Sequence, residues 1–509
     1  MSTTLALGVT VTVLVGFTAV GIWHSRRTVG TVEDLLTARN STGTGRTTAT
    51  LVASVMGVWI LLAAPEAGAS FGIAAVVGYA VGEALPMLAY SRVGPRIREV
   101  IPNGHSLTEY AHARYGSAMY AFVLLVSGLY MFVFLAAELT GIAGALSLVA
   151  GVPQWQTAVL VGGLVLLYTS YGGLRASIFT DSIQALLVLP LLVVAFAGAI
   201  VSLGGASDIH GGIVSTNPSL LDPGFVPGLQ FGLALAFAIL GAELINQTWW
   251  QRIYAAEDGR TVERSFRNAT IANGLIVFLA GLFGLVAAGS ADIVTDVTSS
   301  AYNADIAFFV LLQTAFPEWI VLAVVLLALL LVMSSVDTLF NALSSIVTAD
   351  LPRLLSDPDD QSLKLGARLL TVVVAVSAIY VSLRARSVLR LFFLADLLGA
   401  AVAFPLLYGL YSRRLTGAGA LASSVTGLAV GLAYFPDFSG LLRSLPVLGE
   451  VLPAPDPLYL TAFGGAFLVS TAATLLAARL FPGEYDHGDL TTRIRRLDEA
   501  ATDGGEVTD

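Results

Sequence analysis

The stretch ASVMGVWILLAAPEAG, residues 53–68, decides the fold, because it is an apolar run interrupted by Pro65 and Glu66. A second run, AILGAELINQ at residues 238–247, carries a glycine and Glu243 in a similar place. Proline removes a backbone amide from a helix, and glycine weakens the helix where it sits. Both stretches are therefore predicted to be broken helices, whose free carbonyls and amides can hold an ion or a polar solute. A simple packing kink is the alternative, and the repetition of the break in both halves argues against it.

The composition predicts an all-α integral membrane protein. The chain has 509 residues, of which 56% are hydrophobic and only 12% charged, and its mean hydropathy is +0.80. About a quarter of the residues of a soluble protein are charged. Long apolar runs recur, each able to cross roughly 30 Å of hydrocarbon as a helix, and lipid offers no partner to an open backbone. We expect one membrane domain of about 13 transmembrane helices.

The distribution of basic residues predicts the orientation. The predicted spans are 4–23, 48–71, 74–91, 118–149, 155–171, 178–203, 229–249, 269–289, 317–347, 366–383, 389–411, 417–435 and 458–480. Of the 26 Lys and Arg residues, only Arg384, Arg386, Arg390 and Arg443 fall in loops placed outside. The predicted cytoplasmic clusters are Arg92/Arg96/Arg98, Arg252/Arg260/Arg264/Arg267 and Arg413/Arg414. The positive-inside rule then places the N-terminus outside and the C-terminus in the cytoplasm of a plasma-membrane protein.

The order of the spans predicts two inverted repeats. The first five-helix repeat is 48–203 and the second is 229–411, because five crossings send the second unit through the membrane in the opposite sense. An extra N-terminal span (1–23), a cytoplasmic linker (24–47), two extra C-terminal spans (417–480) and an acidic cytoplasmic tail (481–509) complete the predicted organisation. Residues 204–228 are expected to form the external loop between the repeats.

Carboxylates and hydroxyls inside the spans are candidates for function. A carboxylate in mid-membrane costs about 2.5–3.5 kcal/mol on insertion scales, so it usually faces a cavity. The six candidates are Glu66, Glu83, Glu138, Glu243, Asp337 and Asp396. Glu66 and Glu243 are favoured because they lie at the breaks, whereas hydrogen bonding within the helix packing is the alternative for Glu138 and Asp396. A polar stripe in residues 329–345, which includes Ser334 and Ser335, suits a hard cation that prefers oxygen ligands; small-residue helix packing is the alternative.

Several classes of function are disfavoured. The chain has no cysteine, and its five histidines show no metal-ligand spacing. We find neither a nucleophile beside paired catalytic carboxylates nor a phosphate-binding loop, so we do not expect an enzyme, a cofactor or a nucleic-acid partner. A solute sensor acting through a separate partner protein and a passive channel are the remaining alternatives to a transporter.

The run LYTSYGGLRASIFTDSIQALLV, residues 167–188, closely resembles the signature of the sodium:solute symporter family. ASVMGVWILL resembles the first core span of that family, NQTWWQRIYAAED the segment after its sixth span, and MSSVDTLFNALSS its eighth. The resemblance implies a fold of thirteen spans with a leucine-transporter-type 5+5 inverted repeat. It also implies import of a small polar solute by cation symport through alternating access.

The resemblance also implies site residues. The sodium site would take backbone carbonyls from Ala53, Met56 and Leu331 and hydroxyls from Ser334 and Ser335. Asp181 would lie on the route of the cation to the cytoplasm. Some members carry polar side chains at the positions of Val55 and Gly57, so a proton remains the alternative coupling ion.

The solute is expected to be urea or proline, or a similar small polar molecule. Residues 102–116 and 247–252 resemble the urea-transporting branch, and the spacing from Trp59 to Pro65 resembles the proline transporters. The predicted substrate pocket consists of Trp59, Glu66, Glu243 and Gln247. A proton-coupled urea symporter of the same fold is the alternative function.

Overall fold

The computed structural model describes residues 2–28, 37–296, 298–354, 360–385, 387–444 and 458–494. Each predicted span is α-helical over most of its length, apart from the breaks at residues 56–62 and 244–246. Ten of the described helices are long and apolar enough to cross a membrane by themselves. The helices that carry the spans are α1 (Thr3–Thr28), α3 (Thr44–Val55), α4 (Ala63–Val100), α6 (Ser117–Ala150), α7 (Gln154–Ser202), α9 (Val226–Glu243), α10 (Gln247–Ala255), α11 (Gly259–Ser290), α13 (Glu318–Leu354), α14 (Asp360–Ser382), α15 (Val388–Tyr408), α16 (Gly417–Tyr434) and α19 (Leu458–Leu480).

Short helices connect or flank the long ones. They are η1 (Val58–Leu61), α5 (Leu107–Tyr115), α8 (Ala206–Thr216), η2 (Pro218–Leu221), η3 (Ala304–Ile306), α12 (Ala307–Ala315), α17 (Pro436–Arg443) and α20 (Gly488–Arg493). The predicted external loop 204–228 is therefore largely helical, because α8 and η2 occupy it. These two helices were not predicted from the sequence.

Two long helices each contain the turn between two predicted spans. Gly72 in α4 has φ +73° and ψ −166°, and Gly173 in α7 has φ +57° and ψ −155°. Residues with a Cβ rarely adopt such angles. Consequently α4 combines the second half of the first broken span with the whole of the next span, and α7 combines two spans.

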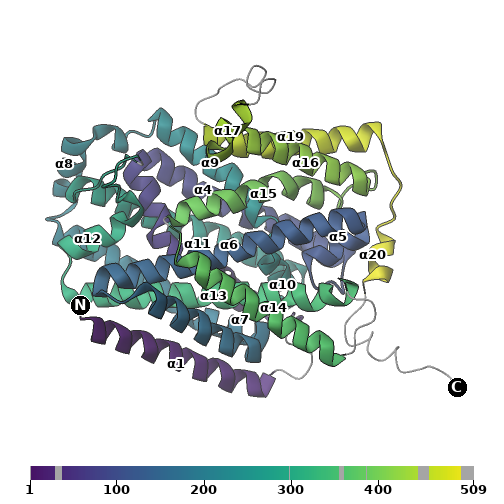
Figure 1. The fold of residues 1–509 in the computed structure, drawn as a ribbon, viewed down its shortest axis with the longest axis horizontal. Helices are drawn as coiled ribbons and strands as arrows, with labels where there is room; N and C mark the ends of the chain where they lie inside the picture. The colour runs from purple at the N-terminus through teal and green to yellow at the C-terminus, as the bar shows by residue number, and fades with distance from the viewer. Residues whose placement is uncertain are drawn as a thin grey trace.

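The helices run roughly parallel, with the first and last spans on opposite flanks (Figure 1). Helix α1 lies along one flank beside α7, and α16 and α19 pack together on the other. The short helices α8 and α12 gather at the end where α1 begins, while α5 and α20 lie at the opposite end (Figure 1). The start of the chain and α20 are thus at opposite ends, as an odd number of crossings requires.

Close helix contacts bring the two halves together in the centre. Helices α4 and α9 approach so closely that a Cβ on Gly78 or Gly232 would overlap the other backbone. Small residues permit such contacts between membrane helices, where dispersion forces rather than water exclusion drive association. This packing places the two broken segments at the middle of the molecule.

The first break lies earlier than the sequence predicts. The chain is non-helical or 3-10 between Val55 and Ala63, whereas Pro65 and Glu66 lie in the first turn of α4. The prediction that Pro65 itself interrupts the helix is therefore wrong. The missing amide of proline costs nothing in a first turn, where amides have no helical acceptor.

Candidate functional site

The break after α3 redirects the backbone hydrogen bonds around two predicted ion ligands. Gly57 N–H donates to the Val55 carbonyl at 3.1 Å, and Ile60 N–H donates to the Gly57 carbonyl at 3.3 Å. In a continuous helix these two amides would donate to Ala53 and Met56 instead. The carbonyls of Ala53 and Met56 thereby lose their helical donors, as a carbonyl that is to ligate an ion must.

The carboxylate of Glu138 on α6 binds a backbone amide in the same break. Val58 N–H donates to Glu138 Oε2 at 2.8 Å, and Glu138 is fully buried. A Cβ at Gly57 would overlap this carboxylate, so only glycine leaves room for it. A carboxylate at a helix N-terminus is stabilised by the unpaired amides and by the helix dipole. Glu138 therefore caps an amide of the break that has no helical acceptor.

A buried polar cluster joins α3, α7, α10 and α13, and Asp181 is its centre. Asp181 on α7 accepts hydrogen bonds from Thr50 at 2.5 Å and from Ser54 at 3.1 Å, both on α3. It also accepts from Ser334 on α13 at 2.5 Å. Its ion-pair partner is Arg252 on α10, with 3.3 Å between Nη2 and Oδ2.

Arg252 is buried within this cluster. Its Nη2 also donates to Ser54 at 2.9 Å and to Thr338 at 2.8 Å, and its side chain has 0% exposure. The sequence-based assignment of Arg252 to a basic cluster at the cytoplasmic boundary is therefore wrong. Its charge is compensated by Asp181 inside the protein and does not face lipid headgroups.

The predicted sodium-site residues lie on the two elements that this cluster connects. Ala53 and Met56 lie at the end of α3, whereas Leu331, Ser334 and Ser335 lie on α13, and all five are buried. Ser334 reaches α3 through Asp181. Within the described part of the chain, the buried Ser335 hydroxyl has no hydrogen-bond partner. A hydroxyl oxygen left in this state is suited to ligate a cation that takes oxygen donors.

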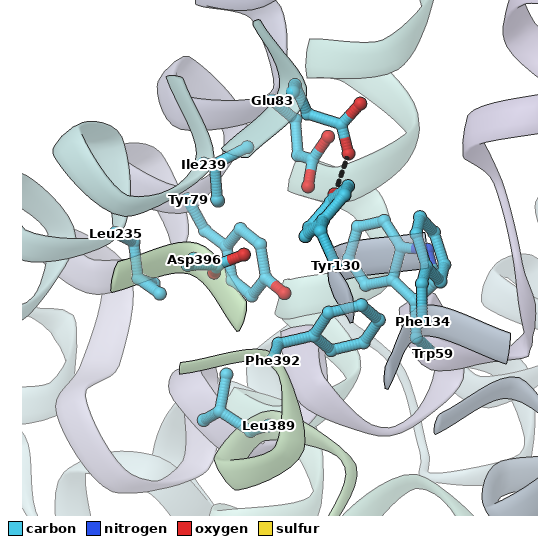
Figure 2. Close-up of a pocket in the computed structure, with 11 residues that line it drawn as sticks. Trp59, Tyr79, Glu83, Tyr130, Phe134, Leu235, Ile239, Leu389, Phe392 and Asp396 are labelled. Atoms are coloured by element: carbon cyan, nitrogen blue, oxygen red, sulfur yellow. Dashed lines mark hydrogen bonds between the residues drawn. The ribbon is translucent and has the colours of Figure 1, made fainter. Parts of the chain in front are cut away.

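A small cavity of about 20 Å³ lies between the second break and α15 (Figure 2). This volume has room for one or two water molecules. Trp59 and Glu243, two of the predicted substrate residues, line it. Its other lining residues are Tyr79, Glu83, Tyr130, Phe134, Leu235, Ile239, Leu389, Phe392 and Asp396.

Glu243, the last residue of α9, is held by three donors. Tyr130 donates to it at 2.5 Å, Trp249 Nε1 at 2.6 Å and Asn246 Nδ2 at 3.1 Å. Two of these donors follow the break on the same chain segment, and the third comes from α6. The hydrogen bonds therefore fix the carboxylate at the point where α9 gives way to α10.

The other two predicted substrate residues lie elsewhere. Glu66 accepts a hydrogen bond at 2.5 Å from Tyr302, which lies between α11 and η3. Gln247 accepts from Leu107 N–H at 2.8 Å and donates to the His105 carbonyl at 2.9 Å. Neither Glu66 nor Gln247 belongs to the residues that line the cavity. The structure brings Trp59 and Glu243 together but not Glu66 and Gln247.

Sequence reasoning missed Thr50, Ser54 and Arg252 as partners of Asp181, and the aromatic residues of the cavity other than Trp59. A helical spacing of four residues was the available signal: Thr50 and Ser54, Ser177 and Asp181, and Ser334 and Thr338 each lie one turn apart. No comparable spacing marks Tyr79, Tyr130 and Phe392, because they come from three helices. Their convergence depends on the tertiary fold.

Comparisons with known proteins agree with this architecture. The sodium:solute symporter family matches residues 35–427. The spermidine transporter DUR31 of Candida albicans is 26% identical over 69% of this chain and 64% of its own length. A probable urea active transporter of Schizosaccharomyces pombe is 24% identical over 44% of this chain and 36% of its own length. The chain thus spans less than two thirds of the length of these two relatives.

Other relatives are covered more fully. The osmoregulated proline transporter OpuE of Bacillus subtilis is 24% identical over 85% of this chain and 88% of its own length. A substrate-bound, outward-open Na⁺-coupled sialic acid symporter superposes with a TM-score of 0.75 and 18% identity, covering 94% of this chain and 99% of that one. The nucleobase-cation symporter Mhp1 in a closed conformation gives a TM-score of 0.57 and 15% identity, covering 89% and 96%. The expected leucine-transporter-type fold is confirmed.

Proposed function

The chain belongs to the sodium:solute symporter family, and we propose from this premise that it imports a small polar organic solute by cation symport through alternating access. Na⁺ is the proposed coupling ion, and the plasma membrane, with the N-terminus outside, is the proposed location. The proposal agrees with the relatives above, which are transporters. It also agrees with the expectation that the chain is not an enzyme.

One observation carries the proposal: a broken α3 end faces hydroxyls of α13 across a fully buried cluster. The carbonyls of Ala53 and Met56 have lost their helical donors, and the Ser335 hydroxyl has no partner among the described residues. Together with Leu331 and Ser334 they supply the neutral oxygen ligands that Na⁺ prefers over nitrogen or sulfur. We propose these five residues as the ion site.

The ion would couple two elements that the cluster already joins. Bound Na⁺ would join α13 to the end of α3. Trp59 lies in the break that follows α3, so the ion would also stabilise the position of this cavity residue. Release of the ion past Asp181 requires its bonds to Thr50, Ser54 and Ser334 to break. The coupling is reciprocal, because any factor by which Na⁺ raises solute affinity must equal the factor by which solute raises Na⁺ affinity.

The solute is proposed from the cavity and from the relatives. Trp59, Glu243 and the neighbouring Glu83 and Asp396 supply polar and aromatic surface for a small molecule. Relatives are named for urea, proline and spermidine, which are all small nitrogen-containing solutes. Glu66 and Gln247 do not line the cavity. We propose that they stabilise the helices that follow the breaks, Glu66 at the start of α4 and Gln247 at the start of α10.

Uptake into proteoliposomes tests this function. An inward Na⁺ gradient is expected to raise uptake of at least one of urea, proline and spermidine about tenfold or more over a K⁺ control, since a tenfold gradient supplies about 1.4 kcal/mol. Ser334→Ala combined with Ser335→Ala removes two ion ligands and should abolish the stimulation.

Ser423→Ala is the matched control. Ser423 is a buried serine whose hydroxyl bonds only to its own helix, at the Gly419 carbonyl (2.7 Å), so its loss should leave stimulation unchanged. If uptake responds only to a proton gradient, the coupling ion is H⁺ and not Na⁺. Uptake indifferent to both gradients would refute symport.

A further inference from the structure

Three acidic side chains line the cavity in Figure 2. Three helices each contribute one carboxylate: Glu83 from α4, Glu243 from α9 and Asp396 from α15. None of the described residues that line the cavity is Lys, Arg or His. The wall therefore carries acidic groups with no protein cation among them.

The three carboxylates differ in what already binds them. Glu243 accepts three hydrogen bonds, as described above. Glu83 is only 5% exposed, and its Oε2 has no hydrogen-bond partner in the described part of the chain. A buried, ionised carboxylate without a partner is strongly unfavourable, so the group either binds a proton or pairs with a cation. Glu83 and the facing Asp396 are thus available to a ligand, whereas Glu243 is largely satisfied by the protein.

Aromatic rings form the rest of the wall. Trp59 stacks on Tyr79 with 5.7 Å between ring centroids and meets Phe392 edge-on at 6.1 Å. Phe134 packs edge-on against Phe392 at 5.0 Å. The faces of such rings attract ammonium groups through their quadrupole, and Trp and Tyr attract them most. An acidic cavity with aromatic walls is therefore matched to an organic cation.

A metal ion fits this wall poorly. Among the described residues, no group of three His, Cys, Asp or Glu side chains is close enough to hold one metal ion. The three carboxylates of the cavity therefore do not converge on one point. The oxygen ligands of a metal ion converge on one point, whereas an organic cation carries its charge on a larger apolar body.

The break itself disfavours a solute that carries a carboxylate. In transporters with broken helices, the free amides of a half-helix bind anionic groups of the substrate. Here Glu138 accepts from Val58 N–H at 2.8 Å, so that this amide of the break, at the start of η1, already has an anionic partner. A solute carboxylate would find the Val58 amide already bound to Glu138. The acidic side chains of the cavity would also disfavour the solute carboxylate.

We infer that the transported solute is an organic cation, a compound with one or two ammonium groups, one of which occupies the cavity of about 20 Å³ between Glu83, Asp396 and the aromatic wall. This inference rests on the proposed transport function and specifies its substrate class. Urea, which is neutral, and proline, which carries a carboxylate, fit the cavity less well.

Equilibrium binding to the purified full-length protein in detergent tests the inference without requiring transport. The probes are putrescine, spermidine and tetramethylammonium, compared with urea and proline by isothermal titration calorimetry. At least one ammonium probe is expected to bind about tenfold or more tightly than urea or proline. Glu83→Gln and Asp396→Asn are each expected to weaken that binding about tenfold or more, because each removes one charge-assisted contact.

Asp305→Asn is the matched control, because Asp305 lines a separate cavity of about 250 Å³ with Leu62 and Val388 and should leave binding unchanged. If a variant does not fold, the selectivity of the unmodified protein decides the matter. Preference for urea or proline, or binding of no probe, would overturn the substrate class.

The two proposals fail in different ways. Na⁺-driven uptake of urea or proline that excess spermidine and tetramethylammonium do not inhibit would leave symport standing and refute the organic cation. Binding of an ammonium probe without any gradient-driven uptake would refute symport and support the substrate class.

Discussion

Arg252 is the residue whose removal should be most costly. It is fully buried, and its Nη2 lies 3.3 Å from Asp181 Oδ2, so that the two charges compensate each other. Removing one partner of a buried pair typically costs about 3–5 kcal/mol, because the other charge is left uncompensated. Arg252→Gln should therefore lower Tm strongly in a detergent-based thermal unfolding assay.

Two variants control for this effect. Arg252→Gln combined with Asp181→Asn should be less destabilised than Arg252→Gln alone, because no charge is stranded. Arg92 is 76% exposed on its side chain and lies 3.4 Å from Glu263, so Arg92→Gln should cost only about 0–1 kcal/mol. Equal losses in the Arg252 and Arg92 variants would contradict the importance assigned to the buried pair.

Single residues were only partly predictable. Ser334 and Asp181 were identified through resemblance and lie 2.5 Å apart across two helices. Arg252 was misjudged, because a positive charge beside a predicted span normally lies at the membrane boundary. Glu138 was assigned to helix packing as readily as to function, since sequence spacing does not reveal that it reaches an amide 80 residues away.

At the scale of elements, the break between α3 and α4 depends on Gly57. An alanine there would push the Glu138 carboxylate off Val58 N–H. Overpacking of this kind costs about 1–3 kcal/mol, and the break would lose its cap. We expect Gly57→Ala to lower both Tm and Na⁺-stimulated uptake.

Gly128→Ala on α6 is the matched control for this variant. A Cβ at Gly128 has no atom within 4 Å, so the alanine should be neutral or slightly stabilising in a helix. Full activity and unchanged Tm in Gly57→Ala would show that Glu138 does not hold the break.

Elements were predicted better where hydrophobicity alone defines them. Every predicted span is helical over most of its length, because lipid forces apolar runs of this length to satisfy their backbone internally. The short helix α5 was missed, although Ser106 caps it by accepting from Glu109 N–H at 3.0 Å. That serine and glutamate form the spacing of a capping box, a signal available in the sequence.

For the molecule as a whole, the proposed ion site predicts stabilisation by Na⁺. A ligand that binds only the folded protein stabilises it by roughly 1.4 kcal/mol for each tenfold rise in concentration above its Kd. Tm should therefore rise with NaCl more steeply than with KCl at equal ionic strength. The rise should vanish in the Ser334→Ala, Ser335→Ala protein and persist in Ser423→Ala. Identical slopes for the two salts would contradict a Na⁺ site.

The global architecture was predictable because it depends on few variables. Span length and two interrupted runs sufficed for a membrane fold with a broken helix in each half, whereas the orientation predicted from the basic residues stays a prediction. The contents of the cavity were not predictable in this way. Trp59, Tyr79, Tyr130 and Phe392 belong to different helices or to the break, and only their packing brings them around Glu83 and Asp396.

The turn at Gly72 has a mechanical consequence. Because α4 passes from the half-helix after the break into the next span with no intervening loop, the connection has no slack. A tilt of the half-helix must either twist the two torsions of Gly72 or swing the whole following span as a lever. A small rotation of the half-helix beside the ion would then displace the far end of α4, near Val100, by a larger distance, because that end lies farther from the turn.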